Sequence, residues 1–151
     1  MQVSSEFRYL GRPMNAPSKE LDTFPAPAHV TLVRFASEEL TSFCPVTAQP
    51  DFYRMEIEYV PDALCVESKS LKLYLWSFRE EQMFAEQLSA TIAQDLANAL
   101  QPLSVKVTLM QSVRGGLELT SVAEIGKDEA ARCASEGGRM KPHDVLLKAE
   151  G

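Results

Sequence analysis

A thiol and a carboxylate stand close together near residue 50 of this chain. Cys44 is followed at once by Pro45, and Asp51 comes seven residues after the cysteine, directly after Pro50. A thiolate can attack an electrophilic carbon, and a nearby carboxylic acid can protonate the atom that gains negative charge. The pair therefore indicates nucleophilic chemistry, with Cys44 as nucleophile and Asp51 as acid. Simpler interpretations stay open, because a lone cysteine is usually an inert thiol and an aspartate after proline commonly caps a turn.

Basic residues that could bind an anion lie further along the chain. Lys69 and Lys72 are three residues apart in a segment with helical periodicity, so they share a face, and Arg114 precedes a Gly-Gly pair that begins at Gly115. Together with Arg79, these cations could gather around an anionic ligand. A lysine pair on a helix is more often a solvated face, and Arg114 could equally be an ordinary hairpin arginine.

Composition narrows the classes of protein to consider. The chain has 151 residues, 45% of them hydrophobic, and a formal net charge of −6. This length fits one domain, and the acidic balance argues against a general nucleic-acid-binding surface. No apolar run is long enough to span a membrane, and the polar N-terminal residues lack the hydrophobic core of a signal peptide. We therefore expect neither a nucleic-acid partner nor a membrane partner.

Cysteine and histidine usage points to a reduced, metal-free protein. The three cysteines are an odd number without metal-ligand spacing, and the chain has only two histidines. A disulfide framework and a histidine-rich metal site are therefore not expected. A cytoplasmic location is the expectation that follows.

The periodicity of apolar residues predicts the order of the elements. Strands are expected over 30–35, over 53–59, over 105–109 and from Leu117 onward, with a short extended piece over 64–66. Residues 37–40 have the composition of a helix start. Two helices are expected between the strand pairs, the first from Ser68 and the second carrying the stripe Phe84, Leu88, Ile92 and Leu96.

This order predicts an α+β fold with ββααββ order, in which an antiparallel sheet carries two helices on one face. Residues 1–26 contain three prolines and no apolar period, so we expect an N-terminal arm without a core of its own. The domain is expected over 27–126. Residues 127–151 would form a C-terminal tail, either a loose helix or a disordered segment.

Four motifs in this order resemble the NADPH-dependent nitrile reductases of queuosine biosynthesis, the 7-cyano-7-deazaguanine reductases. They are Phe43-Cys44-Pro45 with Gln49-Pro50-Asp51-Phe52, the run Val66-Glu67-Ser68-Lys69-Ser70-Leu71-Lys72-Leu73-Tyr74, Ser77-Phe78-Arg79, and Arg114-Gly115-Gly116. Each motif is weak alone, and the specificity comes from their shared order and spacing. The resemblance covers roughly residues 24–126. It implies the tunnelling fold (T-fold), whose subunits associate into an oligomeric barrel with sites between neighbouring subunits.

The resemblance also implies roles for individual residues. Cys44 would add to the nitrile carbon to give a thioimide, and Asp51 would protonate the nitrile nitrogen. Four residues would bind the deazaguanine substrate, namely Glu86, Phe84, Glu67 and Ser68. The alternatives are a solvated helix glutamate for Glu86 and core packing on the stripe of Leu88 for Phe84.

NADPH is the cofactor that the resemblance implies, and its phosphates would be met by Lys69, Lys72, Arg114 and Gly115. The expected reaction converts 7-cyano-7-deazaguanine to 7-aminomethyl-7-deazaguanine by two hydride transfers. The expected partners are therefore this small molecule and further copies of the chain.

Two positions depart from the family pattern. Ala85 stands where the family has a histidine that helps to position groups or relay protons, and Ala48 stands where a glycine is usual. If the turn at Ala48 needs a positive φ, the alanine costs about 1 kcal/mol.

Because of Ala85, two further hypotheses accompany the reductase. In one, the thioimide is captured by an amine to give an amidine. In the other, the chain is a purine-binding T-fold module without turnover.

Overall fold

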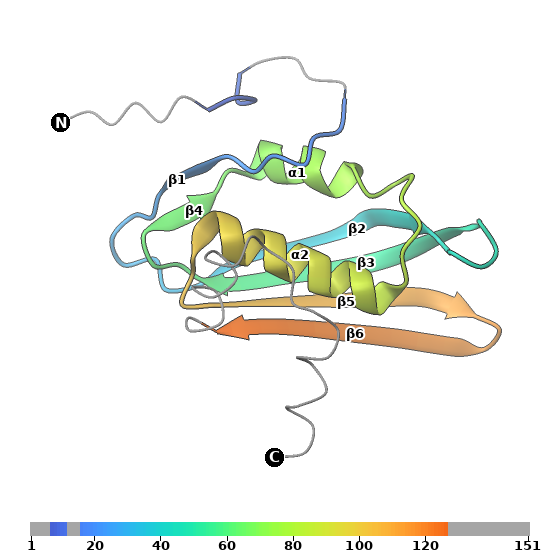
Figure 1. Cartoon of the computed structure of the whole chain (residues 1–151). Coiled ribbons are helices and arrows are strands. Elements are labelled where there is room, and N and C mark those ends of the chain that lie inside the picture. The colour runs from blue at the N-terminus through green and yellow to red at the C-terminus, as the bar shows by residue number, and fades with distance from the viewer. Residues whose placement is uncertain (1–6, 12–15, 127–151) are drawn as a thin grey trace.

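The computed structural model describes residues 7–11 and 16–126, so the predicted tail over 127–151 lies outside the described residues. The elements, labelled in Figure 1, are β1 (Thr23–Pro25), β2 (Val33–Phe43), β3 (Pro50–Val60), β4 (Leu64–Val66), α1 (Ser68–Trp76), α2 (Ala85–Leu100), β5 (Ser104–Arg114) and β6 (Leu117–Gly126).

The four long strands form one antiparallel sheet in the order β2-β3-β5-β6, and the short strands β1 and β4 form a separate antiparallel pair. Figure 1 shows α1 and α2 on the same face of the large sheet. Two hairpins, β2–β3 and β5–β6, flank the helical pair. The predicted α+β class and the ββααββ order are therefore confirmed. The short extended piece expected over 64–66 is β4, and β1 is an addition.

Alternation along β3 explains why the sheet has one covered face. Tyr53, Met55, Ile57 and Tyr59 are each at most 2% exposed, whereas the residues between them lie on the open face. The helical layer supplies the opposing surface, with Leu88, Ile92 and Leu96 of α2 fully buried. These side chains belong to one core cluster. The apolar residues spaced by two in the strand therefore pack against those spaced by 3–4 in the helix.

The first long strand differs from its prediction. The expected strand over 30–35 is too early and too short, because β2 runs from Val33 to Phe43. The expected helix start over 37–40 is wrong, since these residues belong to the strand. The register with β3 shifts between Ser37 and Leu40, where Glu39 N donates to Ser37 Oγ at 3.1 Å. This bulge interrupts the apolar alternation, and the pattern therefore gave no strand signal there.

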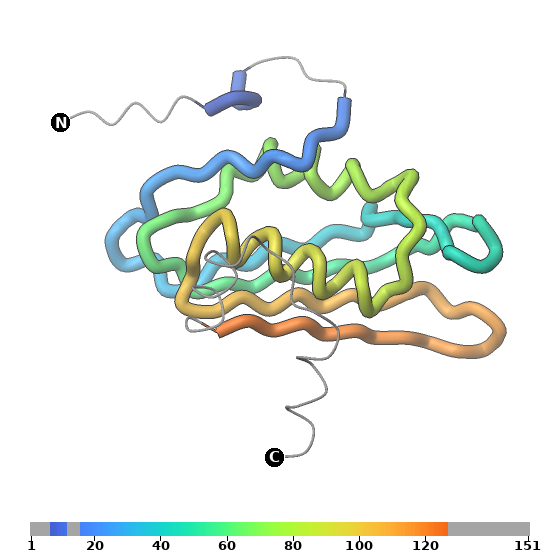
Figure 2. The backbone as a smooth tube through the Cα atoms, viewed as in Figure 1, coloured from blue at the N-terminus to red at the C-terminus, as the bar shows by residue number. Residues whose placement is uncertain are grey.

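The N-terminal arm packs along α1, and Figure 2 shows the two segments side by side. Ser18 N donates to Leu73 O at 3.2 Å, and Asp22 N donates to Ser70 Oγ at 2.9 Å. Further along, β1 pairs with β4. The N-terminal arm is thereby attached to α1 through one backbone carbonyl and one serine hydroxyl of the helix.

The loop between β2 and β3 contains a left-handed residue. Ala48 has φ 55°, and its N–H donates to Cys44 O at 2.9 Å, which closes a tight turn. An L residue with a side chain is strained in this region, whereas glycine is not. The turn therefore does need the positive φ on which the sequence argument depended.

Replacement of Ala48 by glycine should stabilise the protein by about 1 kcal/mol, because it removes the strain at positive φ. The free energy of unfolding in urea measures the effect. Ala123→Gly, on β6 where Ala123 pairs with Val107 in regular register, is the matched control and should destabilise the protein. A glycine at position 48 that destabilises the protein as much as the control does would contradict the assigned turn.

Candidate functional site

Cys44 and Asp51 meet at the end of the β2–β3 hairpin. Phe43 pairs with Pro50 and Ser42 with Asp51, so the strands that carry the thiol and the carboxylate are in register at this point. Cys44 N donates to Gln49 O at 2.9 Å, which extends the pairing into the loop. A separation of seven residues along the chain thus becomes close proximity at one end of the sheet.

The loop activates the thiol. Cys44 is 8% exposed, and it faces the hydroxyl and backbone N–H of Thr47 and the backbone N–H of Val46. These donors stabilise the thiolate and lower the pKa of Cys44 from the ordinary 9.0 to about 7. The Cys44 thiol therefore ionises at a lower pH than an ordinary cysteine, which favours the nucleophilic thiolate.

Arg114 joins this pair from the second hairpin. Its Nη1 donates to Asp51 Oδ1, and the guanidinium also hydrogen bonds with Cys44. The Asp51 carboxylate, followed by Cys44, raises the pKa of Arg114. A register shift between Gln111 and Arg114 precedes a turn in which Gly115 has φ 56°, and a bulge of this kind can redirect a side chain. Arg114 therefore contacts Asp51 and Cys44 in the structure, whereas the sequence suggested that it binds a phosphate of the cofactor.

The segment before α2 lies at the same end of the molecule. Phe43 N donates to Glu81 O at 2.8 Å, and Met83 N donates to Phe43 O at 3.1 Å. Phe84 follows as the residue that caps α2, and it is 52% exposed, so the core-packing alternative does not hold for it. Glu86 is exposed in the first turn of α2.

Tyr53 and Ser42 complete this cluster, and the sequence analysis missed both. Ser42 Oγ donates to Tyr53 Oη at 3.4 Å, and both residues are at most 2% exposed. Burial first, and then charge on Asp51, Glu86 and Cys44, raises the pKa of Tyr53. The signal that could have found Tyr53 is its spacing of two from Asp51, which puts both side chains on one face of β3.

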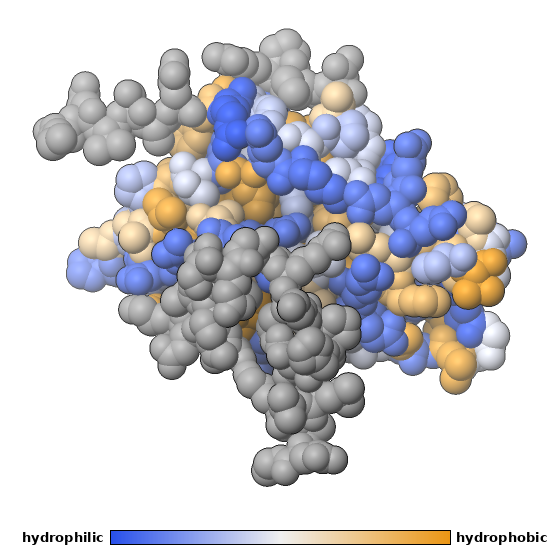
Figure 3. Space-filling view, in the orientation of Figure 1, coloured by the Kyte–Doolittle hydropathy of each residue, from blue (hydrophilic) through white to orange (hydrophobic). Residues whose placement is uncertain are grey.

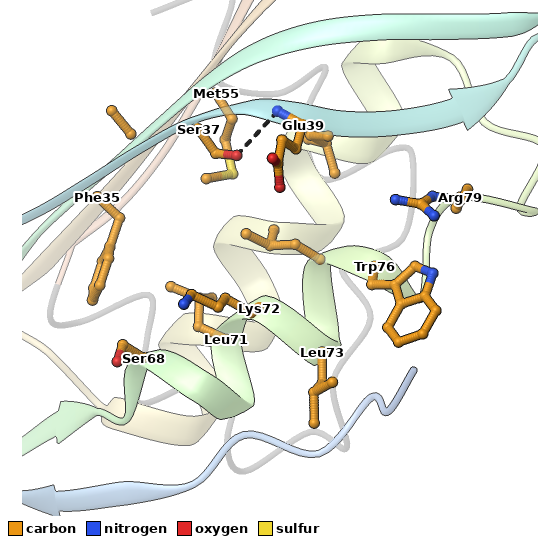
Figure 4. A pocket seen from close by; sticks show the side chains of 13 residues that line it. Phe35, Ser37, Glu39, Met55, Ser68, Leu71, Lys72, Leu73, Trp76 and Arg79 are labelled. Carbon is orange, nitrogen blue, oxygen red and sulfur yellow. Dashed lines mark hydrogen bonds between the residues drawn. The ribbon is translucent and has the colours of Figure 1, made fainter. Parts of the chain in front are cut away.

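The remaining predicted residues gather elsewhere. Ser68 and Lys72 line a cavity of about 500 Å³ between α1 and β2, together with Phe35, Trp76 and Arg79. Figure 4 shows Phe35 and Ser68 toward one end of this cavity and Trp76 and Arg79 toward the other. The cavity has cationic and aromatic walls, which suit an anionic ligand with a flat ring.

Lys69 and Glu67 have structural contacts at the start of α1. Lys69 Nζ donates to Tyr9 O at 2.6 Å, which ties the lysine to the N-terminal arm. The buried Glu67 carboxylate accepts from the backbone N–H groups of Lys69 and Ser70, at 2.7 and 2.9 Å, and so caps the helix. The predicted lysine pair is thus divided, because Lys72 lines the cavity and Lys69 does not.

Within one chain the two groups of residues are far apart. Ser68 shares the cavity with Phe35, and Cys44 lies nine residues after Phe35 along β2 and its end. Because a strand advances about 3.3 Å per residue, Phe35 and Cys44 are roughly 25–30 Å apart. Ser68 lies at the Phe35 end of the cavity (Figure 4), so a single bicyclic base does not touch both Ser68 and Cys44 in one copy of the chain.

Large apolar side chains are exposed around the Cys44 end. They include Val46 at 79%, Phe52 at 54%, Phe84 at 52%, Val113 at 62% and Leu117 at 76% exposure. Figure 3 shows hydrophobic surface at the right-hand end of the molecule, where Figure 1 places the two hairpin tips. An exposed apolar group of this kind marks a surface that binds a ligand or another protein.

Comparison with known proteins identifies the family. A sequence model described as QueF-like protein matches residues 50–130. The chain is 46% identical over 125 residues to the NADPH-dependent 7-cyano-7-deazaguanine reductase of Syntrophus aciditrophicus (strain SB), which covers 82% of this chain and 89% of that protein. The chain belongs to this family. The protein of the same name from Nitrosospira multiformis is 48% identical over 110 residues, 72% of this chain and 79% of its own length.

A solved structure gives the same result for the fold. The crystal structure of the archaeosine synthase QueF-Like in the apo form matches with a TM-score of 0.60 and 29% identity, over 64% of this chain and 94% of that one. The predicted T-fold is consistent with this family and this neighbour. Among the described residues, no helix has the length and apolar character that crossing a membrane requires.

The lowered pKa predicts how Cys44 reacts with iodoacetamide. The alkylation rate of Cys44, followed by peptide mass, should rise with pH and reach half its maximum near pH 7, since only the thiolate reacts. Thr47→Val removes the strongest donor and should move the midpoint upward. Thr108→Val on β5 is the control and should leave the midpoint unchanged. A wild-type midpoint near 9 would contradict the assigned donors.

Proposed function

We propose that the protein reduces the nitrile of 7-cyano-7-deazaguanine to 7-aminomethyl-7-deazaguanine with NADPH, in the biosynthesis of queuosine. The observation that carries this proposal is the pairing of Cys44 and Asp51 at one hairpin end, where the pKa of the thiol falls to about 7. Family membership supports it, because relatives at 46% and 48% identity carry the name of this activity.

The chemistry that we assign to this end begins with attack of the Cys44 thiolate on the nitrile carbon. The carbon–sulfur bond forms while one π bond of the nitrile becomes a lone pair on nitrogen. Asp51 takes the proton that the Cys44 thiol gives up and passes it to that nitrogen, because an unprotonated nitrogen anion would be a poor intermediate. The product is a thioimide on Cys44. Arg114 holds the Asp51 carboxylate and the thiol in place through its contacts with both.

The same end offers groups for the substrate ring. The Glu86 carboxylate can accept two N–H bonds from the edge of a guanine-like base, and a site with such an acceptor discriminates strongly against bases that lack the donors. The exposed ring of Phe84 can pack on the flat face of the base. From another copy, Ser68 at the start of α1 would supply further substrate contacts, and Glu67 holds that helix start in place as its cap.

The cavity beside α1 fits part of NADPH. Lys72 and Arg79 bring positive charge for phosphates, while Phe35 and Trp76 give apolar walls, although Glu39 adds one negative charge. A volume of about 500 Å³ lies within the range of cofactor sites. When bound, NADPH supplies the hydrides of the reaction. Lys69 and Gly115 lie outside this cavity and would meet phosphates only from other copies, whereas Arg114 is engaged by Asp51 and Cys44.

We propose that the complete site forms between copies of the chain. The Cys44 group of one copy would meet the Ser68 and Lys72 group of another, because Phe35, which lies at the same end of the cavity as Ser68 (Figure 4), is roughly 25–30 Å from Cys44 along β2. The exposed apolar side chains around Cys44, such as Val46 and Leu117, would be covered by this contact. A homo-oligomeric barrel would both complete the site and cover the exposed apolar side chains. We propose no direct contact with nucleic acid.

A reducing compartment such as the cytoplasm would keep Cys44 as a free thiol.

A second candidate is formation of an amidine from the same thioimide. The neighbour named archaeosine synthase QueF-Like and the presence of Ala85 favour it. Ala85 is 3% exposed in the first turn of α2 and has no group that transfers a proton. Product mass after incubation with ammonia and without NADPH separates the two activities, since the reductase yields only unreacted nitrile.

Cys44→Ala should abolish nitrile-dependent oxidation of NADPH, with a loss on the order of 10³-fold or more. Wild-type protein should consume two NADPH per nitrile. Cys65→Ala is the matched control, because Cys65 is a buried cysteine on β4, away from the hairpin end, and this variant should retain activity. A Cys44→Ala variant that still reduces the nitrile would overturn the proposal.

Mixing two inactive variants tests whether the site is shared. Cys44→Ala and Lys72→Glu should each be inactive alone, since each removes one group. Co-expression at equal levels should restore about one quarter of the wild-type activity, because random assembly gives both intact groups to about one site in four. The double variant Cys44→Ala/Lys72→Glu, co-expressed with Cys44→Ala, is the control and should stay inactive. No restoration would mean that both groups act within one copy.

A further inference from the structure

Tyr53 forms a buried hydroxyl cluster with Ser42 behind the thiol and the acid. Both residues are at most 2% exposed, and Ser42 Oγ donates to Tyr53 Oη at 3.4 Å. Ser42 pairs with Asp51 across the hairpin, and Tyr53 follows Asp51 by two residues on the same face of β3. The hairpin therefore gathers a phenol, a serine hydroxyl, a carboxylate and a thiol at one end of the sheet.

The hydrogen-bonding state of Tyr53 leaves its own proton available. Because the Tyr53 oxygen accepts from Ser42, its O–H can be directed to another acceptor. Burial raises the pKa of Tyr53, and charge on Asp51, Glu86 and Cys44 raises it further, while the Ser42 contact opposes the shift. The phenol is thus a neutral donor at neutral pH, within the electrostatic reach of the groups that bind and attack the substrate.

The proposed reaction needs more than one proton at nitrogen. A nitrile nitrogen has no hydrogen, whereas the amine has two, so a second proton must follow the one that Asp51 delivers during capture. Asp51 is then a carboxylate paired with Arg114. Among the described residues the single histidine is His29, which lies between β1 and β2, and the residue beside Glu86 is Ala85. The second donor must therefore be another side chain of the cluster or solvent.

Solvent has little access to this cluster. Tyr53 is 2% exposed, Asp51 4% and Cys44 8%, so little water reaches these side chains. Tyr53 is the residue of this cluster that combines burial, an available O–H and a place two residues from Asp51 on the same face of β3. Ser42 adds a second hydroxyl group next to that of Tyr53.

We infer that Tyr53 is the second proton donor of this site. The inference rests on the proposed nitrile reduction. As the thioimide carbon is reduced, its C=N π pair moves to nitrogen, and the proton of Tyr53 Oη passes to that nitrogen. Ser42 Oγ stabilises the phenolate through its hydrogen bond, and the phenolate takes up a proton from solvent once the product has left. The carbon–sulfur bond breaks in the following step and returns the Cys44 thiolate.

Tyr53→Phe tests this role, because it removes the hydroxyl and keeps the ring in the core. Capture of 7-cyano-7-deazaguanine without NADPH should give the same mass adduct on Cys44 as in the wild type. With NADPH, the adduct should accumulate and its consumption should be slowed 10- to 1000-fold. Tyr59→Phe, a buried tyrosine on the same face of β3 whose hydroxyl accepts from Val66 N at 3.1 Å, is the matched control and should consume the adduct at the wild-type rate.

The outcomes separate this inference from the proposed function. Tyr53→Phe protein that consumes the adduct as fast as the wild type would overturn the donor role alone. Equal slowing of capture and of consumption would also overturn it, because that result indicates a packing role of the ring. Wild-type protein that neither forms an adduct nor oxidises NADPH would overturn the nitrile reduction itself, and the donor role with it.

Discussion

The register of the β2–β3 hairpin is the constraint on which the rest of the site depends. Pairing of Phe43 with Pro50 leaves a short loop between Cys44 and Gln49, which closes only because Ala48 adopts a left-handed conformation. The same register places Asp51 opposite Ser42 and points Tyr53 to the covered face. A shift by one residue would move every β3 side chain to the opposite face, so Asp51 and Tyr53 would leave the thiol together.

The fold also divides the functional residues. The strand that brings Cys44 to one end of the sheet carries Phe35 near its other end, beside the cavity at Ser68 and Lys72. No rearrangement within a compact chain brings these ends together, because the sheet between them is continuous. Exposed apolar side chains around Cys44 would be costly in an isolated copy. Assembly of copies end against end would bring the two groups of functional residues together and would cover the exposed apolar side chains. Activity would then depend on the oligomer.

The strands and helices that could be predicted from the sequence are those whose apolar residues keep a regular spacing along the whole element. The alternation from Tyr53 to Tyr59 and the stripe of Leu88, Ile92 and Leu96 were sufficient for β3 and α2, and hence for the layer order. The second half of β2 was missed, because the bulge between Ser37 and Leu40 breaks the alternation.

The site shows a similar division. Motif spacing correctly linked Cys44 with Asp51, since a hairpin brings neighbours along the chain together. The contact between Arg114 and Asp51 joins residues 63 positions apart and depends on a second bulge, so no local pattern announces it. Glu67 was assigned to the substrate, yet the start of α1 uses its carboxylate as a cap. Tyr53 looked like any core residue of a strand, because its hydroxyl partner Ser42 lies on another strand.

The proposed function depends on capture of the nitrile by Cys44 and on reduction of the captured substrate. Intact-protein mass spectrometry after incubation with 7-cyano-7-deazaguanine, before and after addition of NADPH, measures both steps. We expect a mass increase of one substrate per chain, mapped to Cys44, that disappears as NADPH is oxidised and the amine is released. Protein that stays at its native mass under these conditions, while still binding the base, would contradict covalent capture and leave a purine-binding module.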